Sequence, residues 1–260
     1  MTNYQQFMGY RINTLPLARL TTLYGQSIQS SIKENIVFSC ANPHALATAD
    51  TKIDFRKALE DTDILVTDGV GLSLVGRVLG KNLGPRITGS DFFSAIMEQE
   101  NAITLERKTR IYFFGSSQKV LDLMKINLTL RYPNLEFCGF TSPPYGDWSE
   151  VENAQFIEKI NAAKPDILWI GMTAPKQEMW TYKNRKKLNV TLIGNVGAVF
   201  DFCAGTYERA PEWAQKAGLE WLVRLCKEPK RMWRRNFISP IVFIAAALRF
   251  RSTRKHILTR

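Results

Sequence analysis

Cysteine and histidine are scarce in this sequence of 260 residues, and their spacing excludes the commonest metal and disulfide frameworks. The four cysteines are at least 23 residues apart, so the chain has no CxxC pair. The two histidines, His44 and His256, are also far apart. Without clustered Cys or His, a structural zinc site is not expected. A disulfide framework is not expected either, which suits a reducing compartment.

Long apolar runs are also lacking. The longest covers residues 237–250 and is interrupted by Pro240 and Arg249. A membrane-spanning helix needs about 20 apolar residues, so no spanning segment is expected. A shorter apolar run between basic clusters suits the membrane interface. Residues 1–20 lack the basic-then-apolar pattern of a secretory signal. We therefore expect a cytoplasmic protein.

Acidic residues almost disappear towards the C-terminus. The chain has a net charge of +11. Residues 224–260 hold eleven Lys or Arg and one acidic residue, Glu228, which leaves a charge of +1 for residues 1–223. Such asymmetry indicates an anionic partner for the tail, which is a nucleic acid, membrane phosphates or a phosphorylated substrate.

Short apolar segments alternate with helical ones along the first 205 residues. Most of these segments are continuously apolar, which is typical of strands buried on both faces. The predicted strands are residues 35–40, 64–67, 110–114, 135–140, 167–170 and 190–193. The clearest predicted helices are residues 118–132 and 151–163. This alternation predicts an α/β fold with a Rossmann-like, mainly parallel sheet flanked by helices.

The composition changes near residue 205. Beyond it the pattern reads as three helical segments separated by Pro229 and Pro240, with basic residues throughout. We therefore expect residues 1–205 to form the α/β domain. Residues 206–260 are expected to form a basic, amphipathic, helical appendage.

Residues that follow the predicted strands are the candidates for a ligand site, because ligands of open α/β sheets bind at the carboxyl ends of the strands. Asp68 follows one strand, and it fits a general base, a ribose ligand or the cap of the next helix. Gly69 and Gly71 begin a dinucleotide-binding fingerprint, but the third position is Leu74 rather than glycine. This departure counts against an NAD site.

Three further segments allow both a functional and a structural interpretation. Arg86 in the segment RITGSD suits a phosphate or carboxylate, or a loop salt bridge before a helix capped by Ser90 or Asp91. The turn at residues 115–117 suits a phosphate or an ordinary strand-to-helix connection. The DTD segment at residues 61–63 has the form of a metal-binding DxD, but it begins a strand, at the wrong end for the crevice.

Two polar groups remain. The segment Pro175-Lys176-Gln177-Glu178 follows a strand, and its amide and ionic side chains suit sugar hydroxyls, or simply the first turn of a helix with proline in it. The basic cluster of the tail suits a diphosphate, a nucleic acid or a solvated helix face. Its members are Arg224, Lys227, Lys230, Arg231, Arg234 and Arg235.

Taken together and in order, these segments resemble the WecG/TagA/CpsF family, which is glycosyltransferase family 26. The resemblance covers roughly residues 35–240, and its specificity lies in the ordered set, because each motif is weak alone. The matching stretches are Asn42-Pro43, TDGVG (67–71), RITGSD (86–91), FFGSS (113–117), PDILWIGMTAPKQE (165–178), GNVGAVFDFCAGTYERAP (194–211) and GLEWLVRLCKEPKRMWRR (218–235).

The resemblance implies an inverting glycosyltransferase that needs no metal or other cofactor. It would move a sugar from a UDP-sugar donor to a polyprenyl-diphosphate-linked saccharide acceptor. The product would belong to a bacterial cell-surface polysaccharide of the exopolysaccharide, teichoic acid or common-antigen type. The enzyme would bind peripherally to the anionic inner face of the cell membrane, and self-association is also implied.

The resemblance also assigns roles to residues. Asp68 matches the proposed catalytic base, and the substrate-binding positions match Asn42, Arg86, Gln177, Arg224, Arg231 and Arg234. Family members often have threonine where this chain has Cys40, and a thiol donates weaker hydrogen bonds than a hydroxyl does. The donor sugar of the best-known relatives, N-acetylmannosamine, is therefore not assumed. Asp201 is expected to contact the uridine or hold its loop, with a buried structural role as the alternative.

Two other classes of function compete with the transferase. A nucleic-acid-binding protein would use the basic tail and show binding that weakens with salt. A nucleotide-dependent oxidoreductase is disfavoured by the missing fingerprint glycine. The ordered motifs favour the transferase, so no nucleic-acid partner is expected.

Overall fold

The computed structural model describes residues 3–30, 34–103, 107–211, 213–214, 217, 219–227, 229, 233 and 239–258. Within these ranges the side chains of residues 224, 227 and 251–258 are not described.

The centre of the molecule is an eight-stranded sheet in the order β1-β2-β4-β3-β8-β7-β5-β6. The strands are β1 Tyr4–Phe7, β2 Tyr10–Asn13, β3 Ile36–Ala41, β4 Ile64–Thr67, β5 Arg110–Gly115, β6 Glu136–Thr141, β7 Ile167–Gly171 and β8 Leu192–Asn195. The β1–β2 pair is antiparallel, and the other neighbours are parallel. This arrangement confirms the predicted α/β fold.

All six predicted strands are present, and the structure adds a hairpin that the sequence analysis missed. The hairpin consists of β1 and β2, joined by a turn in which Met8 and Gly9 have positive φ. Its segments, YQQF and YRIN, mix polar and apolar residues, so they lack the continuous apolar signal of a buried strand. The strand β6 lies at the opposite edge of the sheet, and most of it is only half-buried.

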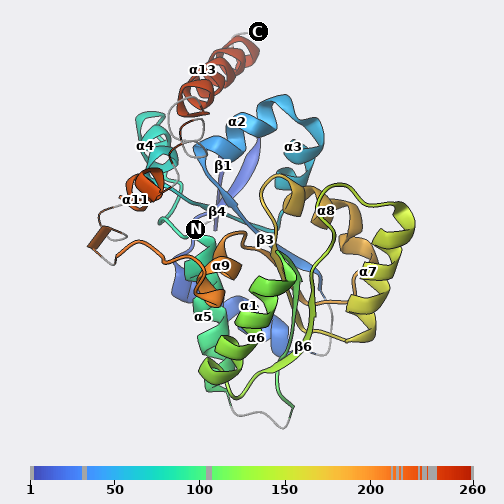
Figure 1. The fold of residues 1–260 in the computed structure, drawn as a ribbon. Coiled ribbons are helices and arrows are strands. Elements are labelled where there is room, and N and C mark those ends of the chain that lie inside the picture. Colours follow the sequence, from blue (N-terminus) through green and yellow to red (C-terminus); the bar gives the residue numbers. More distant parts are fainter. Residues whose placement is uncertain are drawn as a thin grey trace.

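Helices cover both faces of the sheet (Figure 1). One face packs against α1 Leu17–Gln29, α5 Gly89–Ala102, α6 Gln118–Arg131 and α9 Val199–Ala204. The other packs against α2 Pro43–Thr51, α3 Ile53–Glu60, α7 Glu150–Ala162 and α8 Lys176–Asn184, which the 3-10 helix η1 Arg185–Lys187 follows. The helices α6 and α7 agree with the predicted ones to within one residue at each end.

The core of the first face is aromatic. The rings of Phe38 and Phe92 are stacked at 3.9 Å between centroids, and Trp169 meets Phe92 edge-on at 6.2 Å. These residues come from β3, α5 and β7, so the contacts join distant parts of the chain. Burial of such large side chains stabilises the layer by roughly 1.5–3 kcal/mol each.

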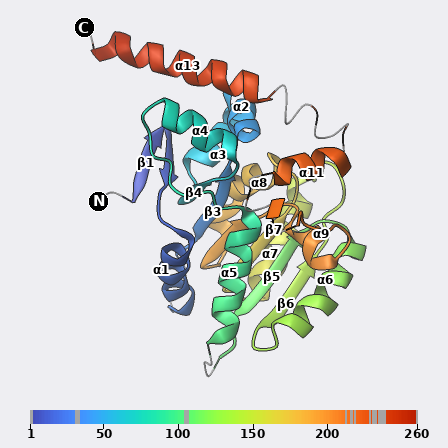
Figure 2. The same ribbon diagram turned by 90° about the vertical axis from the view of Figure 1, so that its left-hand side faces the viewer.

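Three further helices lie around one end of the molecule. They are α4 Val70–Val78, α11 Glu220–Lys227 and α13 Ser239–Leu258. Figure 2 shows α13 running across the top of the molecule, above α2 and α4. Phe243 of α13 is only 1% exposed and belongs to the same apolar cluster as Phe7 and Leu46. Arg249 adds an ion pair to Asp50 of α2, at 3.2 Å.

The C-terminal helix therefore packs on the α/β layer. No helix in the described ranges combines the length and the apolar character needed to cross a membrane. The division of the chain at residues 205 and 206 stays a prediction.

Candidate active site

The register of two central strands brings together two of the predicted site residues. Cys40 pairs with Val66, and Ala41 pairs with Thr67. The next pair in this register is Asn42 and Asp68, and the Asp68 amide donates a hydrogen bond to the Ala41 carbonyl at 2.7 Å. The two side chains therefore leave the carboxyl ends of neighbouring strands side by side.

Asn42 also starts a helix. It is the N-cap of α2, and its Oδ1 accepts a hydrogen bond from the Ala45 amide at 2.9 Å. Pro43 occupies the first turn, where its missing N–H costs nothing. Because the cap uses Oδ1, the Nδ2 group can donate to a ligand.

Asp68 lies between β4 and α4 and is half-buried. Gly69, rather than Asp68, occupies the N-cap position of α4. Gly69 has a φ of +99°, which side-chain-bearing residues rarely adopt, and it turns the chain sharply after Asp68. The helix-capping interpretation of Asp68 is therefore wrong, and the carboxylate remains a candidate for chemistry.

The loop that carries Arg86 is attached to the same strand end. Thr67 donates its hydroxyl to the Leu83 carbonyl at 2.9 Å, and its own carbonyl accepts from the Ile87 amide at 2.9 Å. Arg86 forms an ion pair with Glu220, with 3.0 Å between Nη2 and Oε2. The structure thus shows the salt bridge, and an additional anion at the same guanidinium stays a prediction.

A capping box starts α5 immediately after this loop. The Thr88 hydroxyl accepts from the Asp91 amide at 3.1 Å, and the Asp91 carboxylate accepts from the Thr88 amide at 3.0 Å. The cap is therefore Thr88, and not Ser90 or Asp91, which the structural interpretation of this segment had named. Arg209 donates to Asp91 at 2.8 Å. Burial would raise the pKa of Asp91, but the hydrogen bonds from Arg209 and Thr88 outweigh it and lower the pKa.

Arg209 was missed by the sequence analysis, although it lies in one of the matching stretches. It approaches Glu220 at 3.8 Å, so Glu220 lies between Arg209 and Arg86. This network attaches the first turn of α11 to the site. Arg224 follows one turn later in α11, and its side chain lies outside the described residues, as do Arg231 and Arg234 entirely.

Gln177 lies in the first turn of α8, after the loop from β7. Its Oε1 accepts from the Met172 amide at 3.2 Å, and its Nε2 donates to Oε1 of Glu178 at 2.8 Å. Both side chains are buried. The carboxamide is therefore held in one orientation, with an N–H and a lone pair still available. This bond also connects Glu178, an ionic side chain of the same segment, to Gln177.

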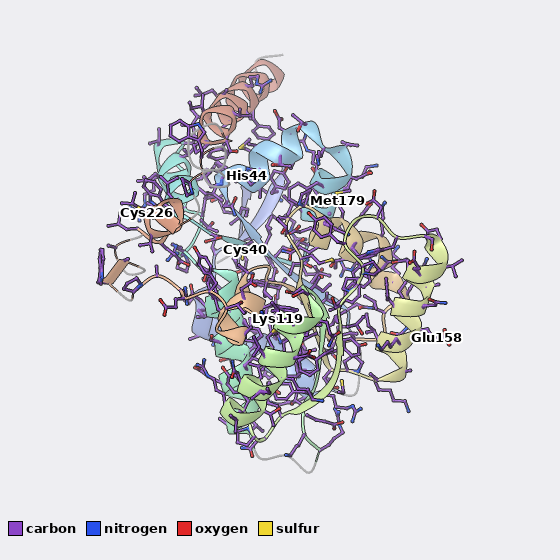
Figure 3. All side chains as sticks on the ribbon, viewed as in Figure 1. Cys40, His44, Lys119, Glu158, Met179 and Cys226 are labelled. Carbon is purple, nitrogen blue, oxygen red and sulfur yellow. The ribbon has the colours of Figure 1, made fainter. Side chains whose placement is uncertain are left out.

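Cys40 lies near the carboxyl end of β3 and is labelled in Figure 3. Burial raises the pKa of its thiol well above the usual range, and the negative charges of Asp68, Glu178 and Asp91 raise it further. The positive charge of Arg86 lowers it in part. The thiol stays protonated and can donate a weak hydrogen bond. The four charged groups therefore lie close enough to the thiol to shift its pKa.

Asp201 lies in α9, beyond the loop that follows β8. Its carbonyl accepts from the amides of Thr206 and Tyr207, at 3.1 and 3.3 Å. Its carboxylate accepts from the Thr206 hydroxyl at 3.5 Å. These bonds support the loop-holding role, and the uridine contact stays a prediction.

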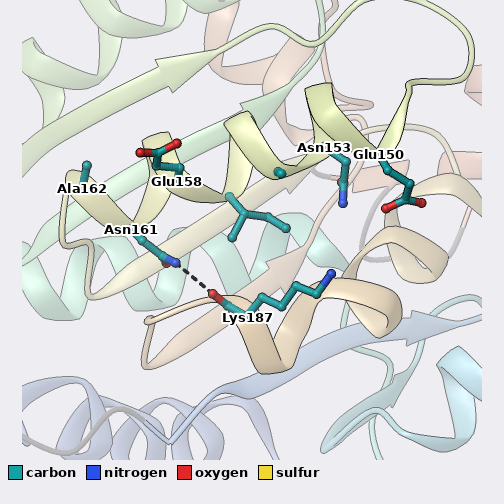
Figure 4. A pocket seen from close by; sticks show the side chains of 8 residues that line it. Glu150, Asn153, Glu158, Asn161, Ala162 and Lys187 are labelled. Carbon is teal, nitrogen blue, oxygen red and sulfur yellow. Dashed lines mark hydrogen bonds between the residues drawn. The ribbon is translucent and has the colours of Figure 1, made fainter.

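A cavity on α7 lies away from this site. It has a volume of about 540 Å³ and is formed by α7 together with Lys187 (Figure 4). Glu158, which lines it, lies far from Cys40 (Figure 3). A smaller cavity, of about 230 Å³, has Arg86 in its wall. It is lined by Val70, Ser73, Leu74, Arg77, Asn82, Leu83, Gly84, Pro85 and Arg86.

The DxD-like segment has a structural role. Arg185 forms ion pairs with Asp61 and Asp63, at 2.7 and 2.6 Å. Asp63 also accepts from the Val37 amide at 2.8 Å. This cluster lies at the amino end of β4, whereas Asp68 follows the carboxyl end of the same strand. In the part of the chain that the structure describes, no three His, Cys, Asp or Glu side chains gather as metal ligands do.

The sequence model of the family described as "Glycosyl transferase WecG/TagA/CpsF family" matches residues 5–257. The chain belongs to this family. It is a glycosyltransferase, and the oxidoreductase interpretation is wrong.

Three relatives of this glycosyltransferase share one name, N-acetylglucosaminyldiphosphoundecaprenol N-acetyl-beta-D-mannosaminyltransferase. The protein of Bacillus spizizenii is 28% identical over 209 residues, which is 80% of this chain and 77% of the relative. The protein of Bacillus subtilis is 27% identical over 208 residues, which is 80% of this chain and 77% of the relative. That of Staphylococcus aureus is 26% identical over 83% of this chain and 82% of the relative.

Proposed function

We propose that this glycosyltransferase moves a sugar from a UDP-sugar to a polyprenyl-diphosphate-linked saccharide, with inversion and without a metal ion. The observation that carries the proposal is the placement of Asp68 beside Asn42 and Arg86, at the carboxyl ends of the central strands. The relatives' shared name describes transfer of N-acetylmannosamine to a diphosphoundecaprenol-linked sugar. The product is proposed to be part of a cell-surface polysaccharide.

In this mechanism Asp68 accepts the proton of an acceptor hydroxyl. The oxygen attacks C1 of the donor sugar, the bond between C1 and the phosphate oxygen breaks, and UDP leaves with the bonding electrons. In-line displacement inverts the anomeric centre. A carboxylate is a weak base, but proton transfer late in the displacement, when the attacking oxygen has become acidic, makes it sufficient.

The departing diphosphate gains negative charge, which cationic side chains must stabilise where no metal does so. Arg86 is proposed for this role, and its position in the loop attached to the end of β4 supports it. Arg224, Arg231 and Arg234 are proposed to bind the leaving UDP or the diphosphate of the acceptor. Gln177, Asn42 and Cys40 would orient the sugar by hydrogen bonds.

The surface of α13 supports attachment to an anionic membrane. Its inner side packs on α2 through Phe243, while Ile241, Ile244 and Leu248 are exposed on the outer side. The spacing of three and four residues places these three side chains on one stripe. The basic tail would add about 1 kcal/mol per Lys or Arg near the surface. We propose that the enzyme works at the cytoplasmic face of the membrane, where its lipid-linked acceptor lies.

The experiment that tests the function measures UDP release from a panel of UDP-sugars, in EDTA, with and without a short-chain polyprenyl-diphosphate saccharide. Asp68→Asn keeps the shape of the side chain but removes the base. Acceptor-dependent release from one donor, reduced at least about 100-fold in the variant, is expected. Full activity of Asp68→Asn, or no release with any donor and acceptor, would contradict the proposal.

A further inference from the structure

Glu178 has an oxygen atom that the described structure leaves unused. The side chain is 5% exposed, and Oε1 accepts the hydrogen bond from Gln177. Oε2 is fully buried and makes no hydrogen bond to any residue that the structure describes. Native proteins pair almost all buried polar atoms, because an unpaired one loses its hydration without compensation. An unpaired carboxylate oxygen at this depth therefore indicates a missing partner.

A second buried glutamate shows what a purely structural arrangement looks like. Glu100, near the end of α5, is 2% exposed. Its Oε2 accepts from the Thr109 hydroxyl at 2.9 Å, and its Oε1 accepts from Gln99 at 3.4 Å. Both oxygens of Glu100 thus have protein partners. Glu178 differs in that one oxygen is satisfied and the other is not.

The carboxyl group of Glu178 faces the end of the sheet where the proposed reaction occurs. It is in the first turn of α8, and its negative charge acts on the Cys40 thiol together with that of Asp68. Its partner Gln177 lies against the loop after β8, where a Cβ on Gly197 would be 3.8 Å from Oε1 of Gln177. The strand β8 lies between β3 and β7 in the sheet. Glu178 is hydrogen-bonded to Gln177, which accepts from the Met172 amide, so its carboxyl group lies near the carboxyl end of β7.

We propose that Oε2 of Glu178 accepts a hydrogen bond from the sugar that is transferred, from a hydroxyl or an amide N–H. The inference rests on the proposed function and assigns the sugar-binding part of that site. In this arrangement Oε1 holds the Gln177 carboxamide in place, and Oε2 binds the sugar.

The charge of the surroundings favours a sugar group over a phosphate at this position. Asp68, Asp91 and Glu178 all act on the same thiol, and Arg86 opposes them with a positive charge. A phosphate next to Glu178 would meet like charge, whereas a hydroxyl or amide N–H donates to a carboxylate. Burial raises the pKa of Glu178 to about 7, and a donor on the ligand would favour the ionised form.

The substitution Glu178→Gln separates the roles of the two carboxylate oxygens. The new carboxamide can accept the bond from Gln177 through its oxygen, so the positioning of Gln177 is kept. The other acceptor is replaced by an NH₂ donor, which cannot receive a hydrogen bond from the sugar. Glu100→Gln is the matched control, because it makes the same change at a buried glutamate outside the site.

The test measures dissociation constants of UDP and of a panel of UDP-sugars, including UDP-N-acetylmannosamine and UDP-N-acetylglucosamine, by titration calorimetry. We expect Glu178→Gln to weaken binding of the preferred UDP-sugar about tenfold or more and to leave the affinity for UDP unchanged. Glu100→Gln should leave both affinities unchanged. The sugar-dependent difference is a readout that a structural role would not produce.

Two results would overturn the inference. Glu178→Gln with wild-type affinity for the UDP-sugar would show that Oε2 does not contact the sugar. An equal loss of affinity for UDP and the UDP-sugar would place the effect on the nucleotide or the fold. Failure of the wild-type enzyme to bind any UDP compound would instead contradict the proposed function, so the two failures are distinguishable.

Discussion

At the scale of single residues, the carboxylates of this chain differ mainly in their partners. Asp63 and Asp91 each have an arginine, and both of these side chains support local structure. Glu178 has a neutral carboxamide on one oxygen and no partner in the described structure on the other. Such an arrangement costs stability in the free protein, as sites prepared for a ligand often do.

This cost predicts an unusual pH dependence of stability. The pKa of Glu178 is raised by burial from 4.5 to about 7, so the folded state binds this proton more tightly than the unfolded state does. The stability that this group contributes is present below pH 4.5 and is lost as the pH rises to 7. Glu178→Gln removes this loss. Between pH 5 and pH 8, we expect the variant to gain about 2 kcal/mol in unfolding free energy relative to the wild type.

Urea unfolding at the two pH values measures this difference. Glu158→Gln, at an exposed position on α7, is the control and should show no gain of that size. A Glu178→Gln variant whose stability follows that of the wild type at both pH values would show that the carboxyl is not desolvated in the folded protein. If Glu178→Gln gains stability and also loses affinity for the sugar, Glu178 serves the function of the protein at a cost to its stability.

At the scale of helices, the N-terminus of α5 connects a helix cap to the candidate active site. The capping box of Thr88 and Asp91 begins this helix, and Arg209 donates to the same carboxylate. Arg209 also approaches Glu220, which pairs with Arg86. A local N-cap is thus connected through two arginines to the loop beside Asp68 and to α11.

A comparison of two capping boxes tests this connection. Thr88→Ala and Ser149→Ala each remove an N-cap hydroxyl, from α5 and α7 respectively, and each should cost about 1 kcal/mol of stability. Only Thr88→Ala alters the network at the site, so we expect kcat to fall about tenfold in this variant alone. Thermal unfolding and UDP release measure the two effects. Equal kcat values in both variants would show that α5 acts only as a support.

At the scale of the whole molecule, α13 connects the α/β layer to the proposed membrane surface. Its inner face is part of the core through Phe243, so removal of the helix would expose apolar surface on α2. Substitutions on the outer face are the sharper test. Ile241→Asp with Leu248→Asp changes side chains that are 70% and 56% exposed. We expect binding to anionic vesicles to fall at least about tenfold, because two apolar side chains no longer enter the interface.

The control is a matched pair at another exposed apolar site. Ile126→Asp with Leu130→Asp changes side chains of α6 that are 59% and 79% exposed. Figure 1 places α6 at the other end of the molecule from α13. Sedimentation with phosphatidylglycerol vesicles measures the binding. Equal losses for the two pairs would reflect net charge alone and would contradict a membrane surface on α13.

Several features of this protein follow from its sequence. Apolar runs, most of them continuous, predicted six of the eight strands in the described residues, because a strand buried on both faces is largely apolar. The β1–β2 hairpin escaped detection because its edge position tolerates polar residues. The ordered motifs identified the family, which the match over residues 5–257 confirms.

The geometry of the site was decided by the tertiary structure. The register of β3 and β4 sets Asn42 opposite Asp68, and no local pattern encodes a pairing between residues 26 positions apart. Arg209 and Glu220 reached the site only through contacts between distant segments. Burial of Glu178, with one oxygen satisfied and one not, likewise depends on how α8 packs. Motifs and apolar periodicity are properties of short segments, whereas register, burial and unmet hydrogen bonds arise only when those segments pack together.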